Sequence, residues 1–313
     1  MSSTAYYPYT PSLILAVIGV GLNCALFAIH AFRLSRSQAW DGIYMLIGAL
    51  FQAMGLGARV FSSENVHSYG AYGAQRVFLV LGPTLCMLTV NLTQVKMMRC
   101  LRSENLGLLP AQFRLPIYLF FNVALLCVQT IGVMMFALTQ DIPLLESASK
   151  ILIASYITQM LFWVFTLVEN IFWSIRFKRS SSSSDTQLMM PNWKRYNQLF
   201  GLAISIIATG RNLMRLTEIG MGGDGFLTVN EWASYAFDYY QVVVVLMVWG
   251  IFYLPGICKE VEFKNVHQAV QTELNVVLFG EQYAQYTKTS VEIGHRRAAL
   301  AVSGLRSLQI SKE

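Results

Sequence analysis

Long apolar segments alternate with short polar segments along most of the chain. Six of the apolar segments run for 17 to 26 residues without an Asp, Glu, Lys or Arg. A helix of about 20 mostly apolar residues crosses the hydrocarbon core of a bilayer. A seventh segment, residues 196–210, is uncharged over only 15 positions. It reaches spanning length only if its helix continues through Arg211, Arg215 and Glu218.

The pattern predicts an all-α polytopic membrane protein with seven transmembrane helices, the sixth of which carries charge into the membrane. We expect one membrane domain, residues 1–258, followed by a cytosolic tail, residues 259–313. The predicted spans are residues 12–32, 42–61, 77–98, 115–138, 151–175, 196–220 and 231–256.

Basic residues between the spans fall mainly on one side of the predicted domain. Eleven lie in the connections after spans one, three and five, and three lie in the connections after spans two and four. Short cytosolic loops carry an excess of Lys and Arg. We therefore expect the N-terminus outside and the C-terminus in the cytosol. The eleven are Arg33, Arg36, Lys96, Arg99, Arg102, Arg114, Arg176, Lys178, Arg179, Lys194 and Arg195, and the three are Arg59, Arg76 and Lys150.

Two segments outside the spans have patterns of their own. Five consecutive serines begin at Ser180, and such a run is typical of a flexible linker. In the tail, Val266, Val270, Leu274 and Leu278 recur at every fourth position, which indicates one amphipathic helix. The tail carries seven Lys and Arg against six Asp and Glu, a balance that does not favour binding to anionic lipid surfaces.

Overall composition agrees with a membrane protein. Of 313 residues, 55% are hydrophobic and 13% are charged, and the mean hydropathy is +0.47. Soluble domains carry roughly 25% charged residues. The composition excludes a soluble enzyme, a nucleic-acid-binding protein and a disordered chain, and we expect no catalytic residues. The five cysteines form no C-x-x-C pair, so neither a disulfide framework nor a zinc site is expected.

Polar residues concentrate in spans six and seven, three in each at positions i, i+4 and i+7, so that each set lies on one face of its helix. The two helices are antiparallel and joined by a short glycine-rich connection. A separation of seven residues is about 10 Å of rise, which places the residues of the two sets at matching depths. The deepest pair is expected to be Arg211 with Asp238, and the pair at the mouth Glu218 with Glu231. The six candidate substrate-binding residues are Arg211, Arg215, Glu218, Glu231, Tyr235 and Asp238.

Two interpretations of this block remain open. In the first, the charges form an ion-pair lock between the two helices. In the second, they line a polar cleft in the outer leaflet that meets a lipid headgroup, because ionisable residues inside a span usually face a partner or a substrate path. Two arginines stand against three carboxylates, which leaves one carboxylate for a cationic amine.

Three other patterns do not carry a function. The connection between spans six and seven resembles half of a calcium-binding loop, with Asp224 and Glu231 in place, but Gly220 and Gly222 occupy two ligand positions. Of the histidines, only His30 lies in a span, so a multi-histidine zinc hydrolase cannot be assembled. There is no G-x-x-x-x-G-K-[ST] motif for nucleotide hydrolysis. We expect no metal and no cofactor.

The block in spans six and seven resembles the fungal RTA-like family of lipid-translocating exporters, which includes exporters of sphingoid long-chain bases. The similarity extends from about residue 7 to residue 256. Its most specific part is matched by Arg211, Arg215, Glu218, Gly225, Glu231, Tyr235 and Asp238. Weaker matches are Pro11, Ser12, His30, Arg59, Gln75, Pro83, Gln129 and Gly132.

The chain departs from the family pattern at three positions. Gln52 and Asn122 stand where the family usually has Glu and Asp, and Leu254 stands where it usually has His. The two amides keep the ability to hydrogen bond but lose the charge. A transport step that uses those acids to bind protons or cations is therefore not expected in this chain.

The resemblance implies a transporter or translocator of amphipathic lipids, with sphingoid long-chain bases as one candidate substrate, in the plasma membrane and in stress or toxicant resistance. Its expected partners are membrane lipids and the amphipathic substrate, with no nucleic acid, and its oligomeric state is left open. The alternative is a seven-helix receptor or lipid sensor without transport activity. Against common receptors, span seven ends in Tyr253-Leu254-Pro255-Gly256 rather than in N-P-x-x-Y.

Overall fold

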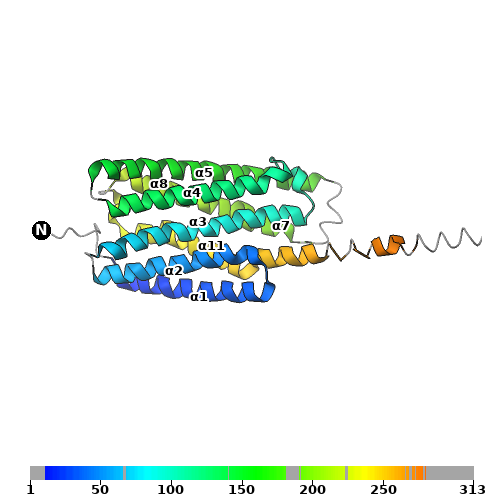
Figure 1. Ribbon diagram of the computed structural model, residues 1–313, viewed down its shortest axis with the longest axis horizontal. Coiled ribbons are helices and arrows are strands. Elements are labelled where there is room, and N and C mark those ends of the chain that lie inside the picture. Colours follow the sequence, from blue (N-terminus) through cyan, green and yellow to red (C-terminus); the bar gives the residue numbers. More distant parts are fainter. Residues whose placement is uncertain are drawn as a thin grey trace, which may run out of the picture. The chain divides into compact units, whose positions relative to one another are not determined.

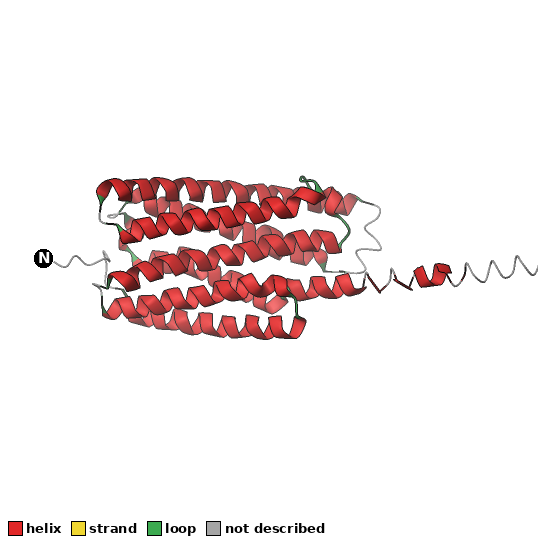
Figure 2. Cartoon of the chain, viewed as in Figure 1, coloured by secondary structure: helices red, strands yellow, loops and turns green. Residues whose placement is uncertain are grey.

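The part of the chain that the structure describes is built of helices and the turns that join them (Figure 2). Seven of the described helices are long and apolar enough to cross a membrane. The prediction of an all-α protein with seven transmembrane helices is therefore confirmed. The computed structural model describes residues 11–65, 68–139, 141–180, 190, 192–222, 225–264, 266–267, 270–271, 273–277 and 279.

The first five spans are single helices, and the last two are each interrupted by a π-helical stretch. Three short helices lie in the connections: η1 (Trp40–Gly42), η2 (Glu104–Leu106) and α9 (Phe226–Val229). The first five spans are α1 (Leu13–Ser37), α2 (Ile43–Glu64), α3 (Tyr69–Cys100), α4 (Ala111–Leu138) and α5 (Ile142–Arg179). Span six consists of α7 (Trp193–Tyr196), π-helical η3 (Asn197–Ala203) and α8 (Ile204–Met221). Span seven begins with α10 (Glu231–Ser234), π-helical η4 (Tyr235–Tyr239) and α11 (Tyr240–Phe252).

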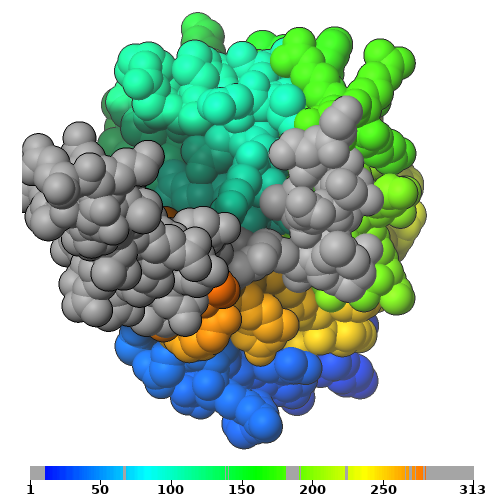
Figure 3. All heavy atoms as spheres, turned by 90° about the vertical axis from the view of Figure 1, so that its right-hand side faces the viewer, coloured from blue at the N-terminus to red at the C-terminus, as the bar shows by residue number. Residues whose placement is uncertain are grey.

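Consecutive spans from α1 to α5 pack side by side, and α8 packs against α5 (Figure 1). Span seven closes the bundle, since α11 contacts α1, α3 and α8. Because the chain crosses back and forth, α1, α3, α5 and span seven all begin at the same end, which we call the N-terminal end. Figure 3 views the opposite end, where the α3–α4 connection and the α1–α2 connection lie on opposite sides of the face.

Two glycines bring α2 and α3 into close contact. A Cβ atom at Gly48 would lie 2.8 Å from the carbonyl oxygen of Gly82, and a Cβ at Gly82 would lie 2.9 Å from that of Gly48. Small residues at a contact allow the backbones of membrane helices to approach closely. This contact fixes the position of α2 relative to α3.

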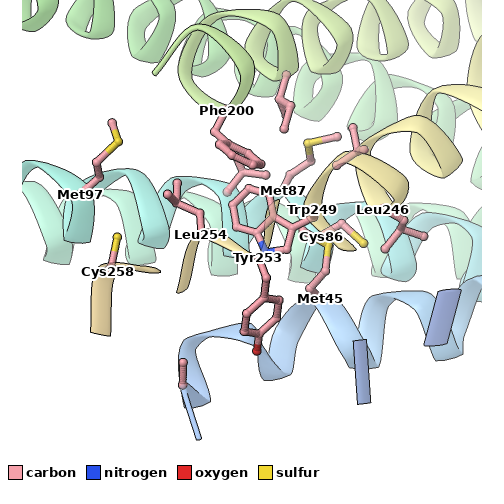
Figure 4. Close-up of a cluster of buried hydrophobic side chains, with 14 of the residues drawn as sticks. Met45, Cys86, Met87, Met97, Phe200, Leu246, Trp249, Tyr253, Leu254 and Cys258 are labelled. Atoms are coloured by element: carbon pink, nitrogen blue, oxygen red, sulfur yellow. The ribbon is translucent and has the colours of Figure 1, made fainter. Parts of the chain in front are cut away.

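Large apolar side chains cover much of the outside of the bundle. Ile14, Phe120, Leu161 and Ile251 are each 60% exposed or more. A monomer in water rarely exposes apolar surface on this scale, whereas lipid chains solvate it. A second apolar region lies inside the bundle, in the half away from the N-terminal end. It is a cluster that includes Met97, Phe200, Trp249, Leu254 and Cys258 (Figure 4).

The chain divides into two compact units, residues 1–261 and residues 262–313. In the second unit the described residues are helical, and Val266, Val270 and Leu274 are exposed. Leu278, the fourth residue of the predicted amphipathic stripe, lies outside the described residues. The same is true of the serine run after Ser180, which itself follows the last residue of α5.

Candidate functional site

Four arginines and three carboxylates meet inside the N-terminal half of the bundle. They come from four different spans, namely α2, α3, span six and span seven. We call this group the arginine–carboxylate cluster; its members are Arg59, Arg76, Arg211, Arg215, Glu218, Glu231 and Asp238.

Asp238 lies at the centre of the cluster. Its Oδ1 is 2.7 Å from Nε of Arg211, and Nη2 of Arg215 donates a hydrogen bond to its Oδ2. The expected pairing of Arg211 with Asp238 is therefore present in the structure. Asp238 belongs to η4, and π-helical turns inside α-helices are frequent at functional sites.

A proline on α3 provides a second partner for Arg211. Pro83 lies inside α3 and has no N–H, so it cannot bond to the carbonyl of Leu79 four residues earlier. Nη2 of Arg211 donates to this Leu79 oxygen at 3.5 Å. The helix break on α3 thus supplies the backbone acceptor that Arg211 reaches across the bundle.

Glu218 is shared by two arginines. Nη1 of Arg215 donates to its Oε2 at 2.8 Å, and Nη1 of Arg76 is 3.6 Å from its Oε1. Arg76 also donates from Nε to the hydroxyl of Tyr72 at 3.2 Å. The Arg76 side chain is 30% exposed, more than any other member of the cluster.

Glu231 joins three helices at their ends. Nη2 of Arg59 donates to its Oε1 at 2.7 Å, and the backbone N–H of Ser12 lies 3.0 and 2.9 Å from its two oxygens. Ser12 also caps α1, because its side chain accepts from the N–H of Leu15. Glu231 thus holds the start of α1 and the end of α2 against the start of span seven.

The charge balance of the cluster differs from the sequence expectation. The spacing in spans six and seven gives two arginines against three carboxylates, with one carboxylate left for an amine, and this prediction is wrong. Arg59 and Arg76 add two positive charges, so the described cluster holds four arginines against three carboxylates. Arg59 lies in α2, near the end of the predicted span 42–61, and Arg76 lies in α3, one residue before the predicted span 77–98. Asp224, in the connection between spans six and seven, lies outside the described residues.

A cavity of about 520 Å³ lies beside the cluster. Its charged lining contains Arg215, Glu218 and Asp238 of the predicted residues, and Arg59 and Arg76 of the residues that the spacing did not identify. Tyr235 also lines it. Arg211 and Glu231 are not part of the lining. The apolar lining comes mainly from α3, α4 and α5 and includes Leu79, Val80, Val133, Phe136, Leu145 and Leu152.

Two tyrosines of η4 join the cavity to neighbouring helices. The guanidinium of Arg59 lies over the ring of Tyr235 at 5.1 Å from its centroid, a cation–π distance. The hydroxyl of Tyr239 accepts from Asn23 at 2.7 Å and donates to the carbonyl of Gly19 at 3.0 Å. These contacts fix η4 against both α2 and α1.

The three positions that depart from the family pattern lie in different places. Gln52 lines the cavity. Asn122 donates from Nδ2 to the carbonyl of Tyr118 in its own helix, at 2.7 Å. Leu254 is fully buried in the apolar cluster of the opposite half. Only the first of the three is therefore placed to contact a molecule in the cavity.

A second buried ion pair lies at the opposite end. Nε of Arg114 donates to Glu169 at 3.0 Å, and Tyr118 donates to the other oxygen of that carboxylate. Arg114 also donates to the carbonyls of Glu104 and Leu109. Counting charges placed Arg114 in a cytosolic loop. The structure shows instead a clamp that holds the α3–α4 connection.

The chain is similar to several proteins of Saccharomyces cerevisiae. Protein RTA1 is 25% identical over 312 residues, which covers 91% of this chain and 95% of that protein. Sphingoid long-chain base transporter RSB1 is 21% identical over 287 residues, 82% of this chain and 74% of its own length. Protoporphyrin uptake protein 1 is 22% identical over 204 residues, 65% of each chain. No solved structure matches the chain.

A family model described as "RTA1 like protein" matches residues 45–261. The match begins in α2 and includes all seven members of the arginine–carboxylate cluster. The matched family is the one that the residues of spans six and seven resemble. The seven apolar helices are consistent with a relative that is itself described as a membrane protein. The chain is a multi-pass membrane protein that belongs to the RTA1-like family.

Proposed function

We propose that this protein is a transporter that moves amphipathic lipids across the membrane, and that the cavity at the N-terminal end receives the polar end of the substrate. The observation that carries the proposal is the mixed lining of the cavity. It contains the charged residues Arg76, Arg215 and Glu218 together with apolar side chains of α3, α4 and α5. Such a lining fits a molecule with one charged end and one apolar body.

The relatives support this class of substrate. One is named for sphingoid long-chain bases and another for protoporphyrin uptake. Both kinds of molecule combine an apolar body with ionisable groups. Transport of such molecules needs no covalent step, so we propose a non-enzymatic role.

The distribution of basic residues supports an orientation with the N-terminus outside, because the connections at the opposite end are rich in Lys and Arg. In this orientation the cavity faces the outer leaflet of the plasma membrane. Epitope tags test it: a tag at Ser2 is expected to bind antibody on intact cells, and a tag after Glu313 only after permeabilisation.

We propose that two buried aromatic rings in the opposite half of the bundle close the path below the cavity. Phe200 of η3 and Trp249 of α11 are buried, and their ring centroids lie 4.7 Å apart in an edge-to-face arrangement (Figure 4). A substrate that leaves towards the opposite end must separate these rings. Because η3 lacks the regular α-helical hydrogen bonds, we propose that span six bends there during transport.

Reconstitution tests the proposed function. Liposomes that contain the purified protein are loaded with a tail-labelled fluorescent amphiphile. Movement of the amphiphile between the two leaflets is followed by chemical quenching from outside. We expect movement above that of protein-free liposomes and of liposomes holding heat-denatured protein. Movement equal to those controls for every amphiphile tested would overturn transport and favour the lipid-sensor alternative.

A further inference from the structure

We infer that the cavity selects amphipathic molecules whose polar end is an anion, a carboxylate or a phosphate, over molecules that end in a cationic amine. The inference rests on the proposed function, because it assumes that the cavity receives the substrate. It goes beyond that function by giving the sign of charge that the site favours.

Each carboxylate of the cluster is already engaged by a guanidinium. Asp238 has Arg211 and Arg215, and Glu231 has Arg59 together with the backbone N–H of Ser12. Glu218 accepts from Arg215, with Arg76 a further 3.6 Å away. An incoming amine therefore finds no described carboxylate of the cluster without a cation beside it.

The wall of the cavity carries more positive than negative charge. Among the described residues that line it, the cations are Arg59, Arg76 and Arg215 and the carboxylates are Glu218 and Asp238. The excess of one positive charge lies in a site bounded by apolar helices, where charges are less screened than in water. A bound anion neutralises this excess, and a bound amine increases it.

Arg76 is the member of the cluster that can receive the anion. Its side chain is the most exposed of the four arginines, and its contact with Glu218, at 3.6 Å, is longer than a hydrogen bond. A guanidinium has five N–H donors and matches the geometry of a carboxylate or phosphate. An oxyanion can therefore pair with the Nη groups of Arg76 while Nε keeps its bond to Tyr72.

The apolar wall begins one helical turn from Arg76. Val80 lies on the same face of α3 and packs with Val133 of α4 and Leu152 of α5, and all three line the cavity. A headgroup at Arg76 can thus extend its apolar body along these side chains. Phe136 lies beside them and widens the apolar surface.

An amine is disfavoured by desolvation as well as by charge. To reach Glu218 or Asp238 it must displace a guanidinium from that carboxylate, which leaves a buried arginine with fewer countercharges. Leaving a buried charge uncompensated is more costly than the attraction that the new pair restores. Selectivity therefore follows from the pairing already present, and it does not require a change in the shape of the cavity.

The test uses four fluorescent amphiphiles with one labelled tail and a carboxylate, a phosphate, an amine or a hydroxyl at the other end. Binding to the full-length protein in lipid nanodiscs is measured near neutral pH, and movement is measured in liposomes. We expect both anions to bind about tenfold more tightly than the amine. Acetate and inorganic phosphate, which lack the apolar body, are expected to compete weakly; full competition would overturn the role of the apolar wall.

Two variants of opposite sign make the test specific. Arg76→Gln is expected to weaken anion binding about tenfold and, because it removes the excess positive charge, to strengthen amine binding. Glu218→Gln removes a competing carboxylate and is expected to strengthen anion binding. The matched control is Lys150→Gln, which removes a cation whose side chain is 73% exposed and outside the cavity lining. Melting temperatures check that each variant is folded.

The outcomes separate this inference from the proposed function. Tighter binding of the amine, or equal binding of all four compounds, would overturn the inference even if every compound moves between leaflets. A similar loss of anion binding in Lys150→Gln and Arg76→Gln would overturn it too, because a general surface charge would then explain the preference. Anion binding without any movement would instead overturn transport and leave the charge preference standing.

Discussion

Asp238 is the residue on which most of the cluster depends, because two arginines share its carboxylate. We expect Asp238→Asn to destabilise the protein by about 3–5 kcal/mol, since it leaves buried arginines without a full countercharge. The double variant with Arg211→Gln should recover much of this loss, because it also removes one of the stranded charges. The melting temperature and the yield of purified protein measure the loss in the single variant and the recovery in the double variant. Equal losses in the single and double variants would show that the pairing is not what holds the helices.

Pro83 provides a second prediction for a single residue. In Pro83→Ala the new N–H of residue 83 can donate to the carbonyl of Leu79. This N–H then competes with Arg211 for that acceptor. We expect stability to be unchanged or higher, and binding and movement of the amphiphile to fall. The control is Pro116→Ala, at an exposed position inside α4. Reduced movement in both variants to the same extent would contradict a specific role for Pro83.

Local spacing predicted some contacts of the cluster and missed others. Arg211 and Asp238 belong to consecutive spans joined by a short connection, so their depth follows from counting residues. Arg59 and Arg76 come from spans that are not neighbours of spans six and seven in the sequence. The sequence placed both arginines on the predicted outer side of the membrane. The spacing did not indicate which faces of α2 and α3 they occupy. The substrate-binding role of the six candidate residues stays a prediction.

At the scale of helices, the contact between α2 and α3 positions one wall of the cavity. Gly82→Ala places a methyl group 2.9 Å from the carbonyl oxygen of Gly48 and 3.0 Å from Cγ of Gln52. Overpacking of this kind costs about 1–3 kcal/mol. Gly57→Ala in α2 meets no atom within 4 Å, and it should stabilise the helix by up to about 1 kcal/mol. We expect the melting temperature to fall in Gly82→Ala and to rise in Gly57→Ala. A lower melting temperature in both variants would contradict the close contact.

The clamp at the opposite end should contribute to stability and not to selectivity. Arg114 and Glu169 are 1% and 0% exposed, so Glu169→Gln leaves a buried arginine without its countercharge. We expect a loss of about 3–5 kcal/mol and an unchanged preference between anionic and cationic amphiphiles. Thermal melting and the binding series together check this. A changed preference would mean that the two ends of the bundle are coupled.

Helix number was predictable and helix neighbours were not. The thickness of the membrane sets the minimum length of a span, so seven apolar segments indicate seven helices. Their ends were less predictable, because α5 begins at Ile142 and continues through Lys150, where counting uncharged residues stops. The packing of α8 on α5 and of α11 on α1 depends on side-chain shapes along whole helices. No short motif contains that information.

For the whole molecule, the proposed transport path runs from the cavity into the opposite half of the bundle. The cavity lies among the starts of α3, α5 and span seven, whereas the rings of Phe200 and Trp249 lie in the other half. The proposed function assigns this arrangement to one state of a transporter that exposes its site alternately to each side of the membrane.

Filling the cavity tests this account most directly. Ser149 of α5 lines the cavity, and Ser147 on the same helix is exposed and does not. Each of the two hydroxyls donates to a carbonyl four residues earlier in its own helix. In liposomes, we expect Ser149→Trp to reduce movement of an anionic amphiphile to the level of protein-free liposomes, while Ser147→Trp moves it at the wild-type rate. Wild-type movement in a folded Ser149→Trp variant would contradict passage through this cavity.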